Sequence, residues 1–261
     1  MTPDELLAAW HAQQTAFIEM RDLRTRTVVD VLAALRAERG RPLRVLDVAC
    51  GPGSLGAALL DRLPDTTVVG IDRDPVLLRL GRETNAFGDR LTFEDRDLTS
   101  DDWGDGLGLF DAAMSATALH WLQPGELATT YLRLAEHLHP GGVFLNADHL
   151  HVDATVHPTL HALSRQVRAD FERDSFAAGV HTWDQWWDEA LRMPGWESEA
   201  ALWRARWADK QRTVKVDVGF HVSSLRAAGF VEVGQVFQWF DDRIVFGRLP
   251  ADWPGRLPED S

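Results

Sequence analysis

An acidic residue stands between an apolar strand and a glycine-rich turn early in the chain. Asp47 lies in the apolar segment 43–48, and Gly51, Gly53 and Gly56 follow it. Glycine lets the backbone approach a ligand where a Cβ atom would collide. A carboxylate at the end of a strand favours a ligand that carries positive charge or hydrogen-bond donors. The stretch therefore predicts a site for a nucleoside-type cofactor that is not a pyrophosphate.

The same glycines match the dinucleotide fingerprint G-x-G-x-x-G, with Asp72 as the acid further along. A dinucleotide site presents backbone N–H groups and a helix N-terminus to a pyrophosphate. Asp47 would repel that anion and would suit an ammonium and a sulfonium instead. Asp47 could also merely order the turn through hydrogen bonds to its own backbone. A nicotinamide-dependent oxidoreductase therefore stays open as a second interpretation.

Composition narrows the class of protein. The chain has 261 residues, of which 45% are hydrophobic, and this fits one α/β domain with an insert. Its 27 basic and 40 acidic residues give a net charge of −13, which disfavours nucleic acid and anionic membranes as partners. The single cysteine excludes an internal disulfide and fits a reducing compartment. No signal-peptide pattern or membrane-length apolar run is present, so we expect a cytoplasmic protein, either a monomer or a homodimer.

Strand and helix patterns alternate through the middle of the chain. Apolar strands are expected at 43–48, 67–71, 91–93, 109–115 and 143–147. Helices are expected between them, and a turn at Pro140-Gly141-Gly142 is expected before the fifth strand. Such alternation predicts right-handed crossovers and a parallel sheet with helices on both faces. Ligands of such sheets bind at the carboxyl ends of the strands.

The remaining segments suggest three parts. Residues 1–40 read as two helices, over 3–20 and 22–39, that cover the site. Residues 41–149 and 216–250 read as the core, which ends in an antiparallel strand pair because the connection between its strands is short. Residues 150–215 read as a helical insert that holds six of the eleven tryptophans.

Segment 45–53 resembles the first motif of class I S-adenosylmethionine-dependent methyltransferases. Segments 68–72, 94–98, 110–122 and 138–144 resemble later motifs in the family's order, and the ending Ala227-Ala228-Gly229-Phe230 is also typical. The resemblance covers about residues 40–150 and 216–248. Position 49 departs from it, because Ala49 stands where the family often has glycine, and its methyl group is expected to narrow the turn.

The resemblance implies an α/β, Rossmann-like fold whose sheet has seven strands and is mostly parallel, with an antiparallel last strand. It implies transfer of a methyl group from S-adenosylmethionine to a small-molecule acceptor by in-line displacement. Asp72 would hold the ribose hydroxyls, and Arg73 would flank the adenine. Asp97 would accept from the adenine amino group, and the N–H of Leu98 would meet a ring nitrogen. The full set of expected cofactor residues is Arg21, Asp47, Ala49, Gly51, Gly53, Asp72, Arg73, Asp97, Leu98, Ser115, Ala116 and His120.

Methyl transfer needs a general base only if the acceptor must lose a proton. His120 is the candidate base closest to the motifs, although it could instead pack over the cofactor. His149 is a secondary candidate. His149, His151, His157 and His161 also suggest a metal site, with Asp148 and Asp153 nearby. Because cysteine ligands and a known metal signature are lacking, we predict no metal.

Tryptophans of the helical insert are candidates for contact with the acceptor. Trp183, Trp186 and Trp187 share one helical face, as the core of a cap or as a lid over an apolar or aromatic acceptor. The expected acceptor residues are Phe17, Trp121, His149, Trp183, Trp186 and Trp187. A protein that binds the cofactor without turnover is the third interpretation.

Overall fold

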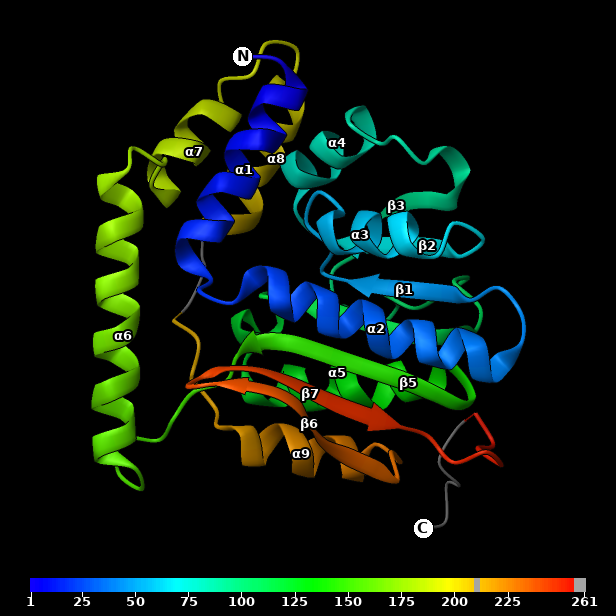
Figure 1. Cartoon of the computed structure of the whole chain (residues 1–261). Helices are drawn as coiled ribbons and strands as arrows, with labels where there is room; N and C mark the ends of the chain where they lie inside the picture. Colours follow the sequence, from blue (N-terminus) through cyan, green and yellow to red (C-terminus); the bar gives the residue numbers. More distant parts are fainter. Residues whose placement is uncertain (209–211, 256–261) are drawn as a thin grey trace.

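A computed structural model describes residues 1–208 and 212–255 (Figure 1). Within these residues one seven-stranded sheet has the order β3-β2-β1-β4-β5-β7-β6. β7 runs antiparallel to both of its neighbours, and the other pairings are parallel, which confirms the predicted fold class. The strands are β1 (Arg44–Val48), β2 (Thr67–Asp72), β3 (Leu91–Asp95), β4 (Phe110–Ala116), β5 (Leu138–His149), β6 (Glu232–Trp239) and β7 (Asp242–Arg248).

Helices cover both faces of the sheet (Figure 1). On one face, α2 (Arg21–Arg39) and α3 (Ser54–Arg62) supply Leu32 and Leu59 to a buried apolar cluster. On the other face, α5 (Pro124–Glu136) and α9 (Val218–Ala227) supply Tyr131 and Leu225 to a second cluster. The two cores immobilise the strands, so the loops at their carboxyl ends are held on a rigid support.

The helix that follows β2 begins as its sequence predicts. Asp74 caps α4 (Pro75–Glu83) by accepting hydrogen bonds from the N–H groups of Val76 and Leu77, at 3.0 and 3.1 Å. Pro75 occupies the first helical position, where a missing N–H has no cost. This cap fixes the backbone beside Asp72 at the end of β2.

The expected turn at Pro140-Gly141-Gly142 is instead an irregularity inside β5. Phe110 pairs with Leu138 and Ala112 pairs with Val143, so four residues of β5 face one residue of β4. Gly141 has a φ of +65°, which an L side chain rarely adopts. The strand pairs on both sides of this bulge, and the glycines accommodate the extra residues.

The N-terminal helix and the insert lie together at one end of the sheet (Figure 1). α1 (Pro3–Phe17) ends three residues before the expected boundary, and the insert forms α6 (Pro158–Ala177), α7 (Trp183–Ala190) and α8 (Glu197–Trp207). α7 and α8 pack with α1 and α4 around buried side chains that include Leu6, Trp186 and Trp196. α6 packs against α1 and stands at the left edge of the view in Figure 1. Among the described helices, none is both long and apolar enough to cross a membrane.

Candidate functional site

A cavity of about 1460 Å³ lies at the carboxyl ends of β1, β2 and β4, where the fold predicts a ligand. Pockets for a single ligand usually measure roughly 300–1,000 Å³. This cavity is therefore large enough for a cofactor and a second molecule. The expected site residues that line it are Phe17, Arg21, Asp47, Ala49, Gly51, Asp72, Arg73, Asp97, Leu98, Ala116, His120, Trp121, His149, Trp183 and Trp187.

Three expected site residues do not line this cavity. Gly53 instead begins α3 with a φ of +81°, and a Cβ atom there would lie 2.7 Å from Phe93. Ser115 is fully buried within β4, and its hydroxyl has no partner among the described residues. Trp186 is also fully buried, and its indole N–H donates to the carbonyl oxygen of Leu6 at 3.1 Å. Gly53 and Trp186 thus serve packing in this structure.

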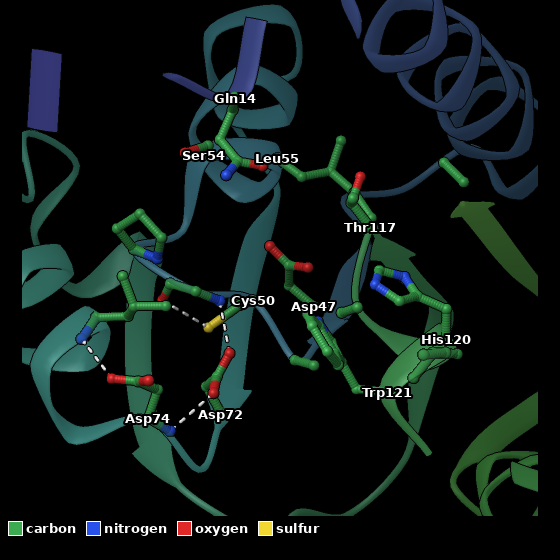
Figure 2. A pocket seen from close by; sticks show the side chains of 18 of the residues that line it. Gln14, Asp47, Cys50, Ser54, Leu55, Asp72, Asp74, Thr117, His120 and Trp121 are labelled. Carbon is green, nitrogen blue, oxygen red and sulfur yellow. Dashed lines mark hydrogen bonds between the residues drawn. The ribbon is translucent and has the colours of Figure 1, made fainter. Parts of the chain in front are cut away.

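Asp47 lies at the centre of the cavity wall (Figure 2). One of its carboxylate oxygens accepts the N–H of Gly56 at 3.1 Å. Burial raises the pKa of Asp47 to about 7, and the nearby Asp72 adds to the increase. A cationic ligand group next to this carboxylate would supply the counter-charge that the cavity wall lacks there.

Asp72 is held at the end of β2 by two backbone hydrogen bonds (Figure 2). Its carboxylate accepts from the N–H of Gly51 at 2.7 Å and from that of Asp74 at 2.8 Å. Burial raises the pKa of Asp72, and it raises the pKa of Asp74 to about 7. The bond from Gly51 fixes the glycine-rich turn to β2, so the carboxylate and the turn present one rigid surface to the cavity.

Ala49 has a φ of +53°, in the left-handed region where glycine is favoured. This explains why glycine would suit the position. The methyl group lies in the cavity lining, as expected from its place in the turn.

Asp95 ends β3 and Asp97 follows it, and the two side chains have different partners. Asp97 lines the cavity, and one of its oxygens lies 3.2 Å from the guanidinium of Arg73. Its other oxygen accepts from the N–H and hydroxyl of Thr99. Asp95 instead pairs with Arg206 of α8 at 2.8 and 3.0 Å. Of these two acids, Asp97 is therefore the one that can reach a ligand.

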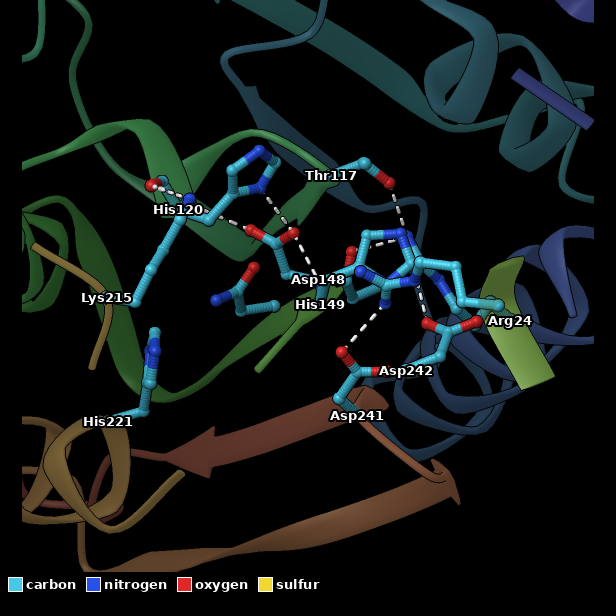
Figure 3. A network of polar contacts seen from close by, with 12 residues as sticks. Arg24, Thr117, His120, Asp148, His149, Lys215, His221, Asp241 and Asp242 are labelled. Atoms are coloured by element: carbon cyan, nitrogen blue, oxygen red, sulfur yellow. Dashed lines mark hydrogen bonds and ion pairs between the residues drawn. The ribbon is translucent and has the colours of Figure 1, made fainter. Parts of the chain in front are cut away.

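His120 belongs to the 3₁₀ turn η2 (Leu119–Trp121) and faces Asp148 of β5 (Figure 3). Asp148 accepts from Nδ1 of His120 at 2.7 Å and from its backbone N–H at 3.0 Å. Burial alone would raise the pKa of Asp148, but His120 and the other cationic neighbours lower it below its usual range. With an ionised Asp148 on Nδ1, Nε2 is left as the proton acceptor of a neutral His120 ring.

His149 is poorly suited to act as a base. Its Nδ1 accepts a hydrogen bond from Arg168 of α6 at 2.8 Å. Burial, together with the positive charges of Arg168 and Arg24, lowers the pKa of His149 to about 3. The ring therefore stays neutral with its acceptor nitrogen engaged, which argues against the catalytic role that the sequence suggested.

Arg24 was not expected at the site. It is 3% exposed, and its guanidinium donates to Asp242, to the hydroxyl of Thr117 and to the carbonyl oxygen of Ala147 (Figure 3). Thr117 has a φ of +55°. Arg24 thus ties α2, β5 and the start of β7 to the loop that leads to His120. In the sequence, Arg24 is one of several arginines of an amphipathic helix, and such arginines usually face solvent.

Of the histidines that suggested a metal, His151 and His161 lie together, with ring centroids 5.4 Å apart. In the described part of the chain, no group of three or more histidine, cysteine, aspartate or glutamate side chains could hold a metal ion. His161 instead hydrogen-bonds through Nδ1 to the carbonyl oxygen of Val152 at 2.9 Å.

Part of the chain is similar to known methyltransferases. A family model described as "Methyltransferase domain" matches residues 45–142. Trans-aconitate 2-methyltransferase from Azoarcus sp. (strain BH72) is 31% identical over 137 residues, 52% of this chain and 49% of that protein. The protein of the same name from Afipia carboxidovorans is 32% identical over 164 residues, 62% of this chain and 57% of that protein. The chain spans about half the length of the curated relatives it matches.

Solved structures share the fold at low sequence identity. An O-methyltransferase family protein from Burkholderia thailandensis has a TM-score of 0.58 at 20% identity, over 87% of this chain and 57% of that chain. Human N-acetylserotonin methyltransferase, solved with SAM, has a TM-score of 0.54 at 15% identity, over 96% of this chain and 60% of that chain. These structures support the fold assignment.

Proposed function

We propose that this chain, which carries a class I S-adenosylmethionine-dependent methyltransferase domain, transfers a methyl group from that cofactor to a small-molecule acceptor by in-line displacement. The observation that carries the proposal is one continuous cavity whose two ends are lined by different functional groups. At one end Asp72 and Asp97 offer carboxylates to a nucleoside. At the other end the His120–Asp148 pair offers a proton acceptor.

Each of the cofactor residues suits a different part of S-adenosylmethionine. Asp72 suits the ribose diol, and Asp97 and the N–H of Leu98 suit the adenine edge. Asp47 suits the ammonium and sulfonium end, because its buried carboxylate gains a counter-charge there. Arg21 lines the cavity and suits the carboxylate of the amino-acid end. When bound, S-adenosylmethionine supplies an electrophilic methyl group, and the chain's part is to hold it in line with the acceptor.

His120 is the proposed general base for an acceptor that must lose a proton. Asp148 fixes the ring through Nδ1 and through the backbone N–H, so Nε2 keeps a set direction toward the cavity. His149 and Arg168 are proposed to contact the acceptor, because both line the cavity near His120: Asp148 accepts from His120 and from the N–H of His149, and Arg168 donates to His149.

Two acceptor classes have specific support. Phe17 and Trp121 line the cavity with aromatic rings, as an apolar or aromatic acceptor requires, and the ring of Trp121 lies 4.9 Å from that of His120. The curated relatives are named for trans-aconitate, a carboxylate, and Arg168 would suit such an anion. A carboxylate acceptor would need no general base, so the role of His120 separates the two classes.

Calorimetry with S-adenosylmethionine and its demethylated product, S-adenosylhomocysteine, tests the proposal directly. We expect both to bind the wild type, and Asp72→Ala to weaken both. Failure of the wild type to bind either compound, or undiminished binding by Asp72→Ala, would refute the proposal.

Two further assays test the other interpretations. A nicotinamide-dependent oxidoreductase would be stabilised by a dinucleotide in thermal unfolding. A binding protein without turnover would bind S-adenosylmethionine but methylate no member of a broad acceptor panel that includes phenols and carboxylic acids.

We also propose a cytoplasmic location and no nucleic-acid partner, on the net charge of −13 and the single cysteine. Size-exclusion chromatography with light scattering would decide between monomer and homodimer.

A further inference from the structure

The last turn of helix α8 is bound to the ends of β2 and β3 by hydrogen bonds and an ion pair. The guanidinium of Arg206 donates to both carboxylate oxygens of Asp95, at 2.8 and 3.0 Å, and also to the carbonyl oxygen of Arg73. Arg73 donates back to the carbonyl oxygen of Arg206 at 3.1 Å, while it pairs with Asp97 at 3.2 Å. One helix end is thus joined to two residues of the proposed adenosine site, Arg73 and Asp97.

The first turn of α8 is fastened separately. Arg79 of α4 donates to Glu199 at 2.9 Å and to the carbonyl oxygen of Gly195 at 3.0 Å. Trp196, 2% exposed, packs in the cluster that α1, α4 and α7 share. This end is therefore anchored in an apolar core. The other end depends on a pair whose side chains are 27% and 40% exposed, Arg206 and Asp95.

A chain of indole rings leads from this fastening to the glycine-rich turn. Trp207 lies 5.2 Å from the guanidinium of Arg73, and Trp203 stacks between Trp207 and Trp187, with ring centroids 6.4 and 4.8 Å apart. All three tryptophans line the cavity. Trp183 continues the row of rings from Trp187 to Trp10, with ring centroids 5.9 and 6.1 Å apart, and a Cβ atom on Gly51 would touch Trp10 at 4.0 Å. The aromatic wall therefore borders the adenosine side of the cavity.

Two of these rings have donors to offer. The indole N–H groups of Trp187 and Trp203 are buried and have no hydrogen-bond partner among the described residues. Buried donors in folded proteins are nearly always paired, so each of these two N–H groups points to an acceptor that the described residues do not supply. Both side chains line the cavity, so a ligand bound there can accept these hydrogen bonds.

We infer that α8 is a latch over the adenosine half of the cofactor site, held shut by Arg206 on Asp95 and Arg73, and that it opens for cofactor exchange. The tryptophan-rich helices α7 and α8 then serve the cofactor. α6, which carries Arg168 and Glu172 into the cavity, is the part of the insert that faces the acceptor. The inference rests on the proposed function, because the nucleoside assignment of Asp72 and Asp97 defines which end the latch covers.

Release of S-adenosylhomocysteine, followed by stopped flow after displacement with excess S-adenosylmethionine, tests the latch. A partly exposed ion pair contributes little, so Arg206→Ala should release the product about three- to tenfold faster. Arg204→Ala is the matched control, because Arg204 is an exposed arginine on the same helix and its replacement removes the same charge. It should release the product at the wild-type rate.

Two further measurements exclude a general loss of structure. Asp95→Asn, a smaller change, should also accelerate release, and combining it with Arg206→Ala should add little, because both remove one interaction. Hydrogen exchange in Arg206→Ala should increase in residues 197–207 and stay unchanged in α3. Release by Arg206→Ala at the rate of Arg204→Ala would overturn the latch alone. Failure of the wild type to bind the product would overturn the proposed function beneath it.

Discussion

Asp148 accepts two hydrogen bonds from a single residue, His120, one from the ring and one from the backbone N–H. Asp148 is fully buried on β5, whereas His120 lies on the turn that follows β4. Because both bonds come from one residue, they fix the position of the turn as well as the tautomer of the ring. The arrangement orients one imidazole nitrogen into the cavity, as a general base requires.

Asp148→Asn should separate the two acceptor classes. The neutral amide gives no counter-charge to the imidazolium that proton transfer forms, and its NH2 group can donate to Nδ1 and so favour the other ring tautomer. Proton transfer through His120 should therefore be lost. For an acceptor with an ionisable O–H or N–H, we expect kcat to fall roughly 10²- to 10⁴-fold, the range for general-base catalysis. The KM for S-adenosylmethionine should stay within about twofold, since Asp72 and Asp97 are untouched.

The control for this variant is His120→Gln, which should lose kcat to a similar extent without additivity in the double variant. For a carboxylate acceptor, already ionised at neutral pH, neither change should reduce kcat beyond about threefold. Unchanged turnover of a phenolic acceptor in both variants would contradict the base assignment.

Much of this site follows from sequence because parallel strands end at one edge. Asp47 lies next to the last residue of β1, Asp72 ends β2 and Asp97 follows β3, and the strand ends of one sheet converge. Their types and positions could therefore be predicted together. The side-chain bonds that hold them, such as Asp72 to the N–H of Gly51, depend on the turn's conformation and could not.

Other features depend on long-range packing that no local pattern reveals. Arg24 looks like a surface residue of an amphipathic helix, and its carboxylate partner Asp242 lies 218 positions away. Trp186 shares a helical face with Trp183 and Trp187, yet α1 covers that part of the face and removes Trp186 from the cavity. A periodic pattern predicts which face is buried, but it does not say which neighbour buries it.

The pKa of Asp47 predicts opposite effects of pH on stability and on binding. Its value is about 7 in the folded protein and 3.8 ordinarily, so the unfolded chain releases this proton first as pH rises. The stability that the retained proton provides is complete below about pH 4 and is lost as pH rises through about 7. A cationic cofactor prefers the ionised carboxylate, so its affinity should rise over the upper part of that window.

Asp47→Asn tests both effects. In the cofactor-free protein, the loss of thermal stability between pH 5 and pH 8 should become smaller, although Asp74 has a similarly raised pKa and keeps part of it. Calorimetry should show weaker binding of S-adenosylmethionine at pH 8 and less dependence on pH. An unchanged pH profile for both properties would contradict the assignment of Asp47 to the cationic end.

Ala49→Gly should not destabilise the protein. An L residue in the left-handed region costs about 1–2 kcal/mol, while glycine costs about 0.4–1 kcal/mol through the entropy of the unfolded chain. We expect the free energy of unfolding, measured with urea, to stay the same or to rise by about 1 kcal/mol. The control is Ala34→Gly, at an exposed position within α2, which should lower it by about 1 kcal/mol. A loss of similar size at both positions would show that the backbone of Ala49 is not strained.

Removing Arg24 should destabilise the fold strongly. Arg24→Met leaves the carboxylate of Asp242, 2% exposed, without its counter-charge. Breaking a buried pair in this way costs about 3–5 kcal/mol. Arg26→Met, on the same helix but 78% exposed at its side chain, should change the free energy of unfolding by less than about 0.5 kcal/mol.

The cost of Arg24→Met should also depend on pH. Burial raises the pKa of Asp242 to about 6 even with Arg24 in place, and loss of the arginine should raise it further. The carboxyl group of the variant is then neutral at pH 5 and carries an uncompensated charge at pH 8. Urea unfolding should therefore show a smaller difference between wild type and variant at pH 5 than at pH 8, and adding Asp242→Asn should remove this dependence. An equal difference at both values would show that Arg24 stabilises the protein through its bonds to Thr117 and Ala147 instead of through Asp242.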